Sequence, residues 1–108
     1  MSTTEGLEQY VKVLLSYDIV PELMDEYYQF ALGKFVPAAQ RMGLGMVEAW
    51  HTAYGDYPSR LIALVAEDRA SADRVLANPE WKKMEAKLQE FVYNYQRRIV
   101  PLRDRFQF

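Results

Sequence analysis

The sequence predicts an α+β fold, a βαββαβ chain in which one antiparallel sheet carries both helices on a single face. Apolar residues alternate along the ranges 8–17 and 44–53, and the range 60–67 is apolar on both faces, which favours strands. Two longer segments repeat apolar residues every three or four positions, the spacing of amphipathic helices. With right-handed crossovers, this order places strands one and three at the centre of the sheet and strands two and four at its edges.

The first strand has one apolar face, formed by its odd positions: Val11, Val13, Leu15 and Tyr17. Asp18 then offers a helix N-cap, and Pro21 suits the first turn because a first-turn amide has no helical partner. The apolar stripe of this helix continues to Met42. Pro37 should kink the helix or end its first segment, and Gly43 should close it.

Turn and capping residues organise the second half of the chain. The range 54–59 is rich in glycine, proline and small polar residues and predicts a hairpin loop between strands two and three. Asp68 or Ser71 can cap a short helix after the third strand. Asn78, Pro79 and Glu80 together give the strongest helix start in the chain: a capping side chain, a proline at the first helical position and an acid in the first turn.

The last helix and the last strand meet near Asn94, where the apolar pattern changes. The expected apolar face of the helix consists of residues at helical spacing: Trp81, Met84, Leu88, Phe91, Val92 and Tyr95. A short final strand should cover the range 98–102. Pro101 lies in it and favours an edge position, because proline cannot donate to a neighbouring strand.

Composition and charge restrict the possible functions. The 108 residues have the length of one domain, 1–108, of which we expect 1–6 to be a flexible start. The chain has no cysteine and one histidine, His51, so we expect no metal site and no cofactor. A net charge of −2 argues against binding to nucleic acids or anionic membranes. With no spanning apolar run and no signal-like start, we expect a cytoplasmic protein.

The sheet face turned away from the helices needs a cover. Alternation places these apolar residues on it: Tyr10 and Leu14, Met46 and Trp50, and either Ile62 with Leu64 or Leu61 with Ala63 and Val65. Leaving such side chains in water forgoes about 1.5–3 kcal/mol each. The simplest cover is a second copy related by a two-fold axis, which gives a homodimeric barrel. Its interior would also hold polar residues of the strands: Lys12, Ser16, Glu48 and Arg60.

The element order, this sheet face and the segment Leu76-Ala-Asn-Pro-Glu-Trp81 resemble the dimeric α/β-barrel superfamily of ferredoxin-like proteins. Its small members include the antibiotic-biosynthesis-monooxygenase, stress-responsive barrel, EthD-like and NIPSNAP-like types. The resemblance covers roughly Gln9 to Leu102 and concerns architecture rather than a catalytic motif. It implies a homodimer with a small-molecule pocket between sheet and helices. Several members act on aromatic or polyketide substrates without a metal or organic cofactor.

His51 is the candidate general acid or base, because histidine is the side chain whose ordinary pKa lies nearest neutrality. It follows Trp50 and precedes Tyr54 by three residues, so Tyr54 or Tyr10 could be its hydrogen-bond partner on a phenolic or enolic substrate. The alternative is a partly solvated histidine of an edge strand. Some cyclases of the superfamily use a histidine with a tyrosine, which the resemblance extends to His51 and Tyr54.

Aromatic and charged residues on the strands and the first helix are candidate ligand contacts. Tyrosine joins apolar area to a hydroxyl group, and among the eight tyrosines Tyr10 and Tyr27 are the best candidates, with Trp50 as a stacking surface. The charged candidates are Lys12, Glu48 and Arg60, which could hold a substrate carboxylate or carbonyl. Core packing explains the aromatic residues equally simply, and ion pairs across neighbouring strands explain the charges.

Specific residues argue against three other protein classes that share this strand and helix order. An RNA-recognition domain needs aromatic residues on its central strands, and the range 60–67 has none. A ferredoxin needs cysteines, and a heme-degrading relative needs a histidine placed as iron ligand, whereas His51 falls on a predicted strand. Two hypotheses remain: a cofactor-independent monooxygenase, isomerase or cyclase for a small hydrophobic or aromatic compound, and a non-catalytic ligand-binding or protein-interaction module.

Overall fold

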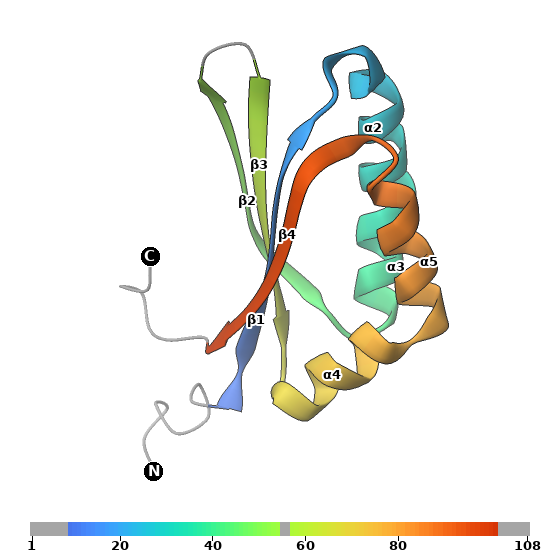
Figure 1. Cartoon of the computed structure of the whole chain (residues 1–108). Coiled ribbons are helices and arrows are strands. Elements are labelled where there is room, and N and C mark those ends of the chain that lie inside the picture. Colours follow the sequence, from blue (N-terminus) through green and yellow to red (C-terminus); the bar gives the residue numbers. More distant parts are fainter. Residues whose placement is uncertain (1–8, 55–56, 102–108) are drawn as a thin grey trace.

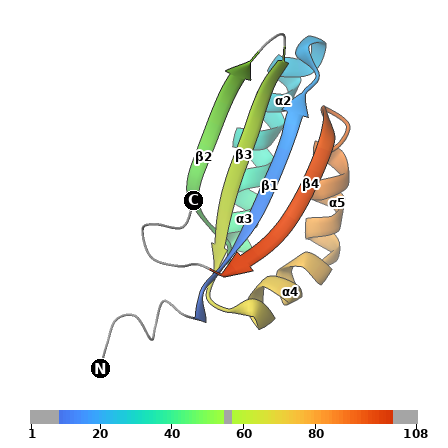
Figure 2. The same cartoon turned by 60° about the vertical axis from the view of Figure 1, so that its left-hand side comes forward.

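The sheet has the strand order that the sequence predicts. The computed structural model describes the backbone of residues 9–54 and 57–101 and the side chains of residues 9–45 and 60–101. Its strands are β1 (Val11–Ile19), β2 (Gly45–Tyr54), β3 (Tyr57–Ala66) and β4 (Val92–Pro101). They pair antiparallel in the order β2-β3-β1-β4 (Figure 2). The apolar strands β1 and β3 therefore lie at the centre, as expected, and β4 with Pro101 lies at an edge.

The helices all cover one face of this sheet (Figure 1). After a 3₁₀ turn at Pro21–Leu23, the first crossover runs through α2 (Met24–Phe30), a π-helical stretch (Ala31–Phe35) and α3 (Val36–Arg41). The π-helical stretch ends at Phe35, two residues before Pro37, whose missing amide hydrogen prevents a regular hydrogen-bond pattern in the preceding turn. The second crossover consists of α4 (Arg69–Ala77) and α5 (Pro79–Leu88). The interruption of the first helix near Pro37 thus agrees with the prediction.

The helix starts of the second crossover are capped as the sequence predicts. Asp68 accepts a hydrogen bond of 2.7 Å from the backbone amide of Ser71, and this bond lowers the pKa of the Asp68 carboxyl. Asn78 accepts one of 2.8 Å from the amide of Glu80. Both bonds satisfy amides that have no carbonyl partner in the first helical turn.

The predicted cap at Asp18 is wrong. β1 continues to Ile19, and the backbone of Asp18 pairs with that of Tyr93 in β4. Its side chain accepts a hydrogen bond of 2.9 Å from Asn94 Nδ2, and the helical turn that begins at Pro21 has no side-chain cap. Pairing with β4 places Asp18 in the sheet, so its side chain serves a neighbouring strand instead of a helix.

The boundary between α5 and β4 also differs from the prediction. α5 ends at Leu88, and β4 starts at Val92, well before the expected range 98–102. Asn94 has φ of 57°, and the pairing of β4 with β1 shifts register beside it. This bulge turns both Val92 and Tyr95 toward the core, although residues three apart on a regular strand face opposite sides. The bulge therefore imitates helical spacing in the sequence.

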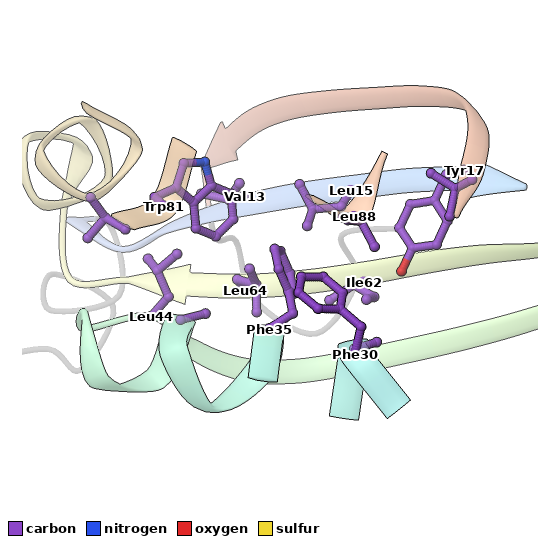
Figure 3. Packing of buried hydrophobic residues seen from close by; sticks show 14 of the residues in the cluster. Val13, Leu15, Tyr17, Phe30, Phe35, Leu44, Ile62, Leu64, Trp81 and Leu88 are labelled. Atoms are coloured by element: carbon purple, nitrogen blue, oxygen red, sulfur yellow. The ribbon is translucent and has the colours of Figure 1, made fainter. Parts of the chain in front are cut away.

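The hydrophobic core lies between the sheet and the helices (Figure 3). Alternate residues of the central strands face it, as predicted for β1: Val13, Leu15, Tyr17 and Ile19 from β1, and Ile62, Leu64 and Ala66 from β3. From the helices, Phe35 and Trp81 pack against each other with ring centroids 5.3 Å apart, and neither is more than 1% exposed. This packing fixes α5 against the first crossover and closes one end of the core.

The pairing of β2 places Met46 differently from the prediction. The backbone of Met46 lies opposite Leu64, a core residue, whereas Trp50 lies opposite Leu61 on the other face of the sheet. A register shift between Met46 and Glu48 separates the two pairings, so the backbone pairing assigns Met46 and Trp50 to opposite faces of the sheet. The side chains of Met46 and Trp50 lie outside the described residues.

Candidate functional site

Polar aromatic residues gather at the end of the core remote from Trp81. Figure 3 shows Tyr17 at this end, with its hydroxyl group directed toward the helix layer. The hydroxyl groups of Tyr17 and Tyr27 are 2.6 Å apart, and the two side chains are 3% and 2% exposed. Burial raises the pKa of both phenols, because a phenolate would lose its hydration. Both residues therefore remain neutral hydrogen-bonding groups at neutral pH.

Arg60 joins this pair from β3. Its backbone lies opposite Tyr17, and its guanidinium group contacts Tyr28 of α2 twice. Nη2 donates a hydrogen bond to the Tyr28 hydroxyl, and Cζ lies 5.0 Å from the centroid of the Tyr28 ring. The side chain thus faces the helices, which corrects the expectation that Arg60 would face the interior of a dimeric barrel. We call Tyr17, Tyr27, Tyr28 and Arg60 the tyrosine–arginine cluster.

One donor of the tyrosine–arginine cluster has no acceptor. Arg60 Nε is buried and makes no hydrogen bond to any residue that the structure describes. The indole nitrogen of Trp81 has the same status, but it lies in the apolar core among Phe35 and its neighbours. Buried donors are rarely left without a partner in native proteins, so each such case requires an explanation. At Arg60 the neighbouring hydroxyl groups make the surroundings polar.

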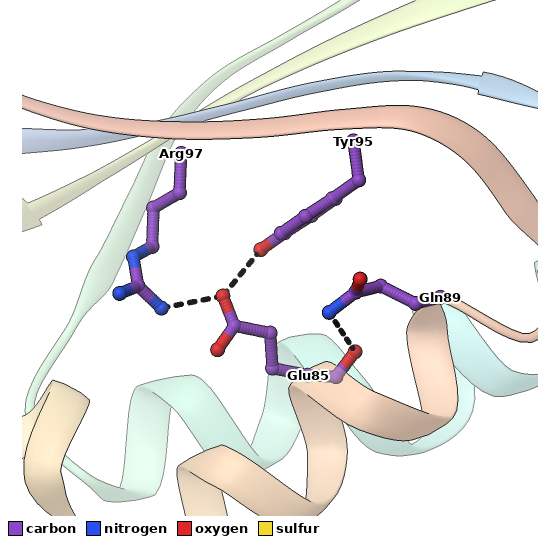
Figure 4. Close-up of polar contacts among 4 residues, drawn as sticks. All are labelled: Glu85, Gln89, Tyr95 and Arg97. Atoms are coloured by element: carbon purple, nitrogen blue, oxygen red, sulfur yellow. Dashed lines mark hydrogen bonds and ion pairs between the residues drawn. The ribbon is translucent and has the colours of Figure 1, made fainter.

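A second polar network lies beside the cluster, between α5 and β4 (Figure 4). Glu85 Oε2 accepts a hydrogen bond of 2.8 Å from the Tyr95 hydroxyl and forms an ion pair of 2.5 Å with Arg97 Nη1. The Glu85 side chain is 14% exposed, and Gln89 Nε2 donates to its backbone carbonyl. Tyr95 also stacks on Tyr17, with ring centroids 6.1 Å apart. Burial raises the pKa of Tyr95, and its bond to Glu85 raises it further.

The predicted catalytic residues lie on β2, where only the backbone is described. The backbone of His51 pairs with that of Arg60, so it reaches the same end of the sheet as the tyrosine–arginine cluster. Tyr54 pairs with Tyr57 at the end of the hairpin, and Glu48 pairs with Ala63. The side chains of His51, Tyr54, Trp50 and Glu48 lie outside the described residues. Their predicted roles therefore stay predictions.

The remaining predicted ligand residues fall on two faces of the sheet. Tyr27 and Arg60 lie together on the helix side, both in the tyrosine–arginine cluster. Lys12 lies half-buried on the opposite face, because its neighbours Val11 and Val13 flank it on the alternating strand β1 and Val13 is in the core. Tyr10 precedes β1 and is 36% exposed. One compact site cannot include both Lys12 and Arg60 within a single chain.

Sequence analysis missed several polar residues of this region. Tyr17 looks like an ordinary apolar position of a strand, and Tyr28 lies beside the apolar stripe of the first helix rather than in it. Glu85 and Arg97 form a contact because β4 starts at Val92, and the bulge at Asn94 made this strand start resemble a continuation of the helix in the sequence. The abundance of tyrosine was the available signal, since eight occur in 108 residues.

Two further kinds of site, a metal site and a membrane-spanning helix, are both absent from the part of the chain that the structure describes. None of their His, Cys, Asp and Glu side chains form a group of three or more that could hold a metal ion. Within the same part of the chain, every helix is too short or too polar to span a lipid bilayer.

Comparisons with other proteins agree on the fold. The sequence matches no protein-family model, and no curated protein matches it either. Among solved structures, an uncharacterised NIPSNAP-like domain protein from Burkholderia xenovorans superposes with a TM-score of 0.67 at 20% identity, over 94% of this chain and 90% of that chain. A NIPSNAP family protein from Agrobacterium tumefaciens gives 0.66 at 17% identity, over 93% and 90%.

A candidate antibiotic biosynthesis monooxygenase from Deinococcus radiodurans also superposes, with a TM-score of 0.66 at 14% identity over 91% of this chain and 97% of that chain. At these identities the similarity concerns the fold and not the activity. Together with the strand order β2-β3-β1-β4, it confirms the ferredoxin-like α+β fold that the sequence resemblance implied. The chain has the ferredoxin-like α+β fold of the NIPSNAP-like and antibiotic-biosynthesis-monooxygenase-like proteins.

Proposed function

We propose that this protein is a homodimer that binds a small planar, hydrophobic or aromatic molecule carrying an acidic oxygen at the tyrosine–arginine cluster. The unpartnered Nε of Arg60 carries this proposal. A guanidinium group is a planar fork of donors suited to carboxylates and other oxygen acceptors. Here one arm of the fork is occupied by Tyr28, and the Nε edge is available to an acceptor that the chain itself does not supply within the described residues.

The surroundings of Arg60 favour an aromatic ligand. The rings of Tyr27 and Tyr28 pack edge to face, with centroids 5.1 Å apart, and the Arg60 guanidinium group lies over the Tyr28 ring. Such groups combine an apolar surface with hydroxyl donors, which is the usual lining of small-molecule sites. Leaving a buried donor unsatisfied costs about 1–3 kcal/mol, so an acceptor on a ligand would add to affinity by relieving that cost.

The proposed dimer covers the sheet face opposite the helices. Half-buried apolar residues of three strands lie on this face, flanked by polar ones: Leu14, Leu61, Val65 and Val100, with Lys12, Ser16, Gln96 and Arg98. The backbone register adds the positions of Glu48 and Trp50 from β2. A second copy would bury these apolar residues, which stabilises the dimer by about 25 cal/mol per Å² of apolar area removed from water. A two-fold axis would place the same sheet face of both copies in contact.

Arg60 can be tested by ligand binding. The probes are benzoate, salicylate and a series of phenols, with affinity measured by calorimetry for the whole protein and for Arg60→Gln. Loss of a charge-assisted bond should weaken binding of an acidic aromatic probe about 10- to 100-fold. The matched control is Arg41→Gln, which removes an exposed arginine paired with Glu80 on the helix surface and should leave affinity unchanged. Equal affinity for both variants and the wild type would contradict the proposed site.

His51 gives a second candidate function, catalysis, because its backbone pairs with that of Arg60. A histidine at this position could remove a proton from a phenolic or enolic ligand, which is the step that a cofactor-independent monooxygenase, isomerase or cyclase requires. Each acidic aromatic probe that binds is therefore incubated under air with the wild type, His51→Ala and Tyr54→Phe. Turnover that falls with His51→Ala while binding persists favours an enzyme. Binding without turnover favours the non-catalytic alternative.

A further inference from the structure

The tyrosines of the core form a continuous row that extends beyond the proposed ligand site. From Tyr28 to Tyr27 the ring centroids are 5.1 Å apart, from Tyr27 to Tyr17 they are 5.8 Å apart, and from Tyr17 to Tyr95 they are 6.1 Å apart. The row begins at Tyr28 of α2, whose ring lies under the Arg60 guanidinium group, and ends at Tyr95 of β4, which bonds to Glu85 of α5. Ligand binding explains neither its length nor its carboxylate end.

The hydroxyl groups of this row differ in their partners. Tyr28 accepts a hydrogen bond from Arg60, and Tyr17 and Tyr27 bond to each other. Tyr95 donates to the Glu85 carboxylate, at 2.8 Å, and Arg97 holds that carboxylate in place. A phenol loses its proton when it loses an electron, because the phenol radical cation is a very strong acid. A carboxylate in hydrogen-bond contact can accept that proton at once, so the partners of Tyr95 favour its oxidation over that of the other three.

We propose that Tyr95 is a redox-active tyrosine and that the row Tyr28-Tyr27-Tyr17 conducts an oxidising equivalent to it. A one-electron oxidant takes one electron from the row and is itself reduced by one electron. Each oxidised ring recovers an electron from its neighbour until Tyr95 is the electron donor. The O–H bond of Tyr95 then breaks, the proton binds to Glu85 Oε2, and the products are a neutral phenoxyl radical and a neutral carboxylic acid. This inference does not depend on the proposed ligand.

The end point is tested with an oxidant in solution. A ruthenium tris-bipyridyl complex is photo-oxidised by persulfate in the presence of the whole protein, and radicals are trapped by freezing and measured by electron paramagnetic resonance. The wild type should give one dominant tyrosyl spectrum. Tyr95→Phe should lose it, and Glu85→Gln, which removes the proton acceptor but retains the size of the side chain, should give a large reduction. Glu80→Gln, at an exposed acid of the same helix, is the matched control and should leave the signal unchanged.

The row itself is tested with a tethered oxidant. The chain has no cysteine, so Leu32→Cys provides a unique attachment point. Leu32 is 65% exposed and lies one helical turn after Tyr28. With the complex attached there, the Tyr95 radical should form when the row is intact. It should be lost in Tyr17→Phe, because phenylalanine is much harder to oxidise than tyrosine and interrupts the row. The same Tyr17→Phe variant should still form the Tyr95 radical with free oxidant.

Two results would overturn the proposal. A wild-type signal that is the same in Tyr95→Phe and Glu85→Gln would mean that Tyr95 is not the end point. A tethered signal at Tyr95 that persists in Tyr17→Phe would mean that the row does not conduct. Circular dichroism and thermal unfolding establish that each variant is folded, and an unfolded Glu85→Gln is replaced by Glu85→Asn in the same comparison.

Discussion

At the scale of single residues, the buried hydroxyl pair of Tyr17 and Tyr27 is the most constrained polar contact of the core. Each hydroxyl group is the other's partner at 2.6 Å, and both rings are almost fully buried. Removing one hydroxyl leaves the second without a partner in a region of low dielectric, where an unsatisfied group is costly. The pair therefore stabilises the end of the core that carries Arg60.

This pair should make the free energy of unfolding decrease as the pH rises into the alkaline range. Burial raises the pKa of both phenols above the unfolded value of 10.0. Their contribution is therefore fully present below pH 10 and is lost as the pH rises above it, because only the unfolded chain ionises readily there. Tyr27→Phe should lose about 1–2 kcal/mol of unfolding free energy near neutral pH and show a smaller decline above pH 10 than the wild type.

Urea unfolding followed by circular dichroism between pH 7 and about pH 11 measures both effects. Tyr10→Phe is the control, since Tyr10 is 36% exposed and lies before β1. A Tyr27→Phe variant with the same alkaline slope as the wild type would show that the buried phenols do not set the pH dependence.

At the scale of elements, local signals predicted helix starts better than they predicted strand ends. Asp68 and Asn78 cap their helices as expected, because a capping bond involves only residues two or three apart in the chain. Asp18 has the same local signal, but pairing with β4 places it in the sheet. That pairing joins residues 75 positions apart, Asp18 and Tyr93, and nothing near Asp18 in the sequence indicates it.

The same reasoning explains which parts of the candidate site were predictable. Tyr27 and Arg60 could be chosen because their residue types suit a ligand. Their meeting with Tyr28 depends on the packing of α2 against β3, which residue types do not reveal. Glu85 and Tyr95 were not paired because the bulge at Asn94 imitated helical spacing. These contacts therefore depend on pairing and packing between segments distant in the sequence, which local sequence patterns do not reveal.

The Asp68 cap predicts a pH effect of opposite sign to that of the tyrosines. The hydrogen bond from the Ser71 amide lowers the pKa of Asp68 below 3.8, the ordinary value. Its contribution is present above pH 3.8 and is lost as the pH falls through the lowered pKa. Asp68→Asn keeps an acceptor oxygen but has no charge to titrate, so the acid-induced loss of stability below pH 4 should be smaller than in the wild type.

Unfolding curves at neutral pH and at about pH 3 measure this difference. The control is Asp73→Asn, at an exposed residue of the same helix that pairs with Arg69 at 3.1 Å. Surface pairs of this kind contribute little, so the control should keep the acid sensitivity of the wild type. An Asp68→Asn variant as acid-sensitive as Asp73→Asn would contradict the titrating cap.

At the scale of the whole molecule, the element order was sufficient to predict the topology. Strand β3 is apolar on both faces, which favours a central position in the sheet. The proline of β4 favours an edge position, because it cannot donate a hydrogen bond to a neighbouring strand. These two conditions permit the observed order β2-β3-β1-β4. The helices then cover one face only, which leaves the second face for the proposed second copy (Figure 1).

The dimer is tested on the open face at Leu61, whose backbone lies opposite Ser16 at the centre of the sheet. At micromolar concentration, sedimentation of the wild type should give roughly 25 kDa, twice the chain mass of 12.6 kDa. Leu61→Glu introduces a charge that a second copy would have to bury, so this variant should sediment at 12.6 kDa. Leu32→Glu, on the helical surface, should remain dimeric because that surface stays in water in the proposed assembly. The wild-type mass decides the question even if Leu61→Glu fails to fold: a folded wild type that sediments as a single chain would leave the apolar face of the sheet uncovered in solution, and the proposed barrel would be wrong.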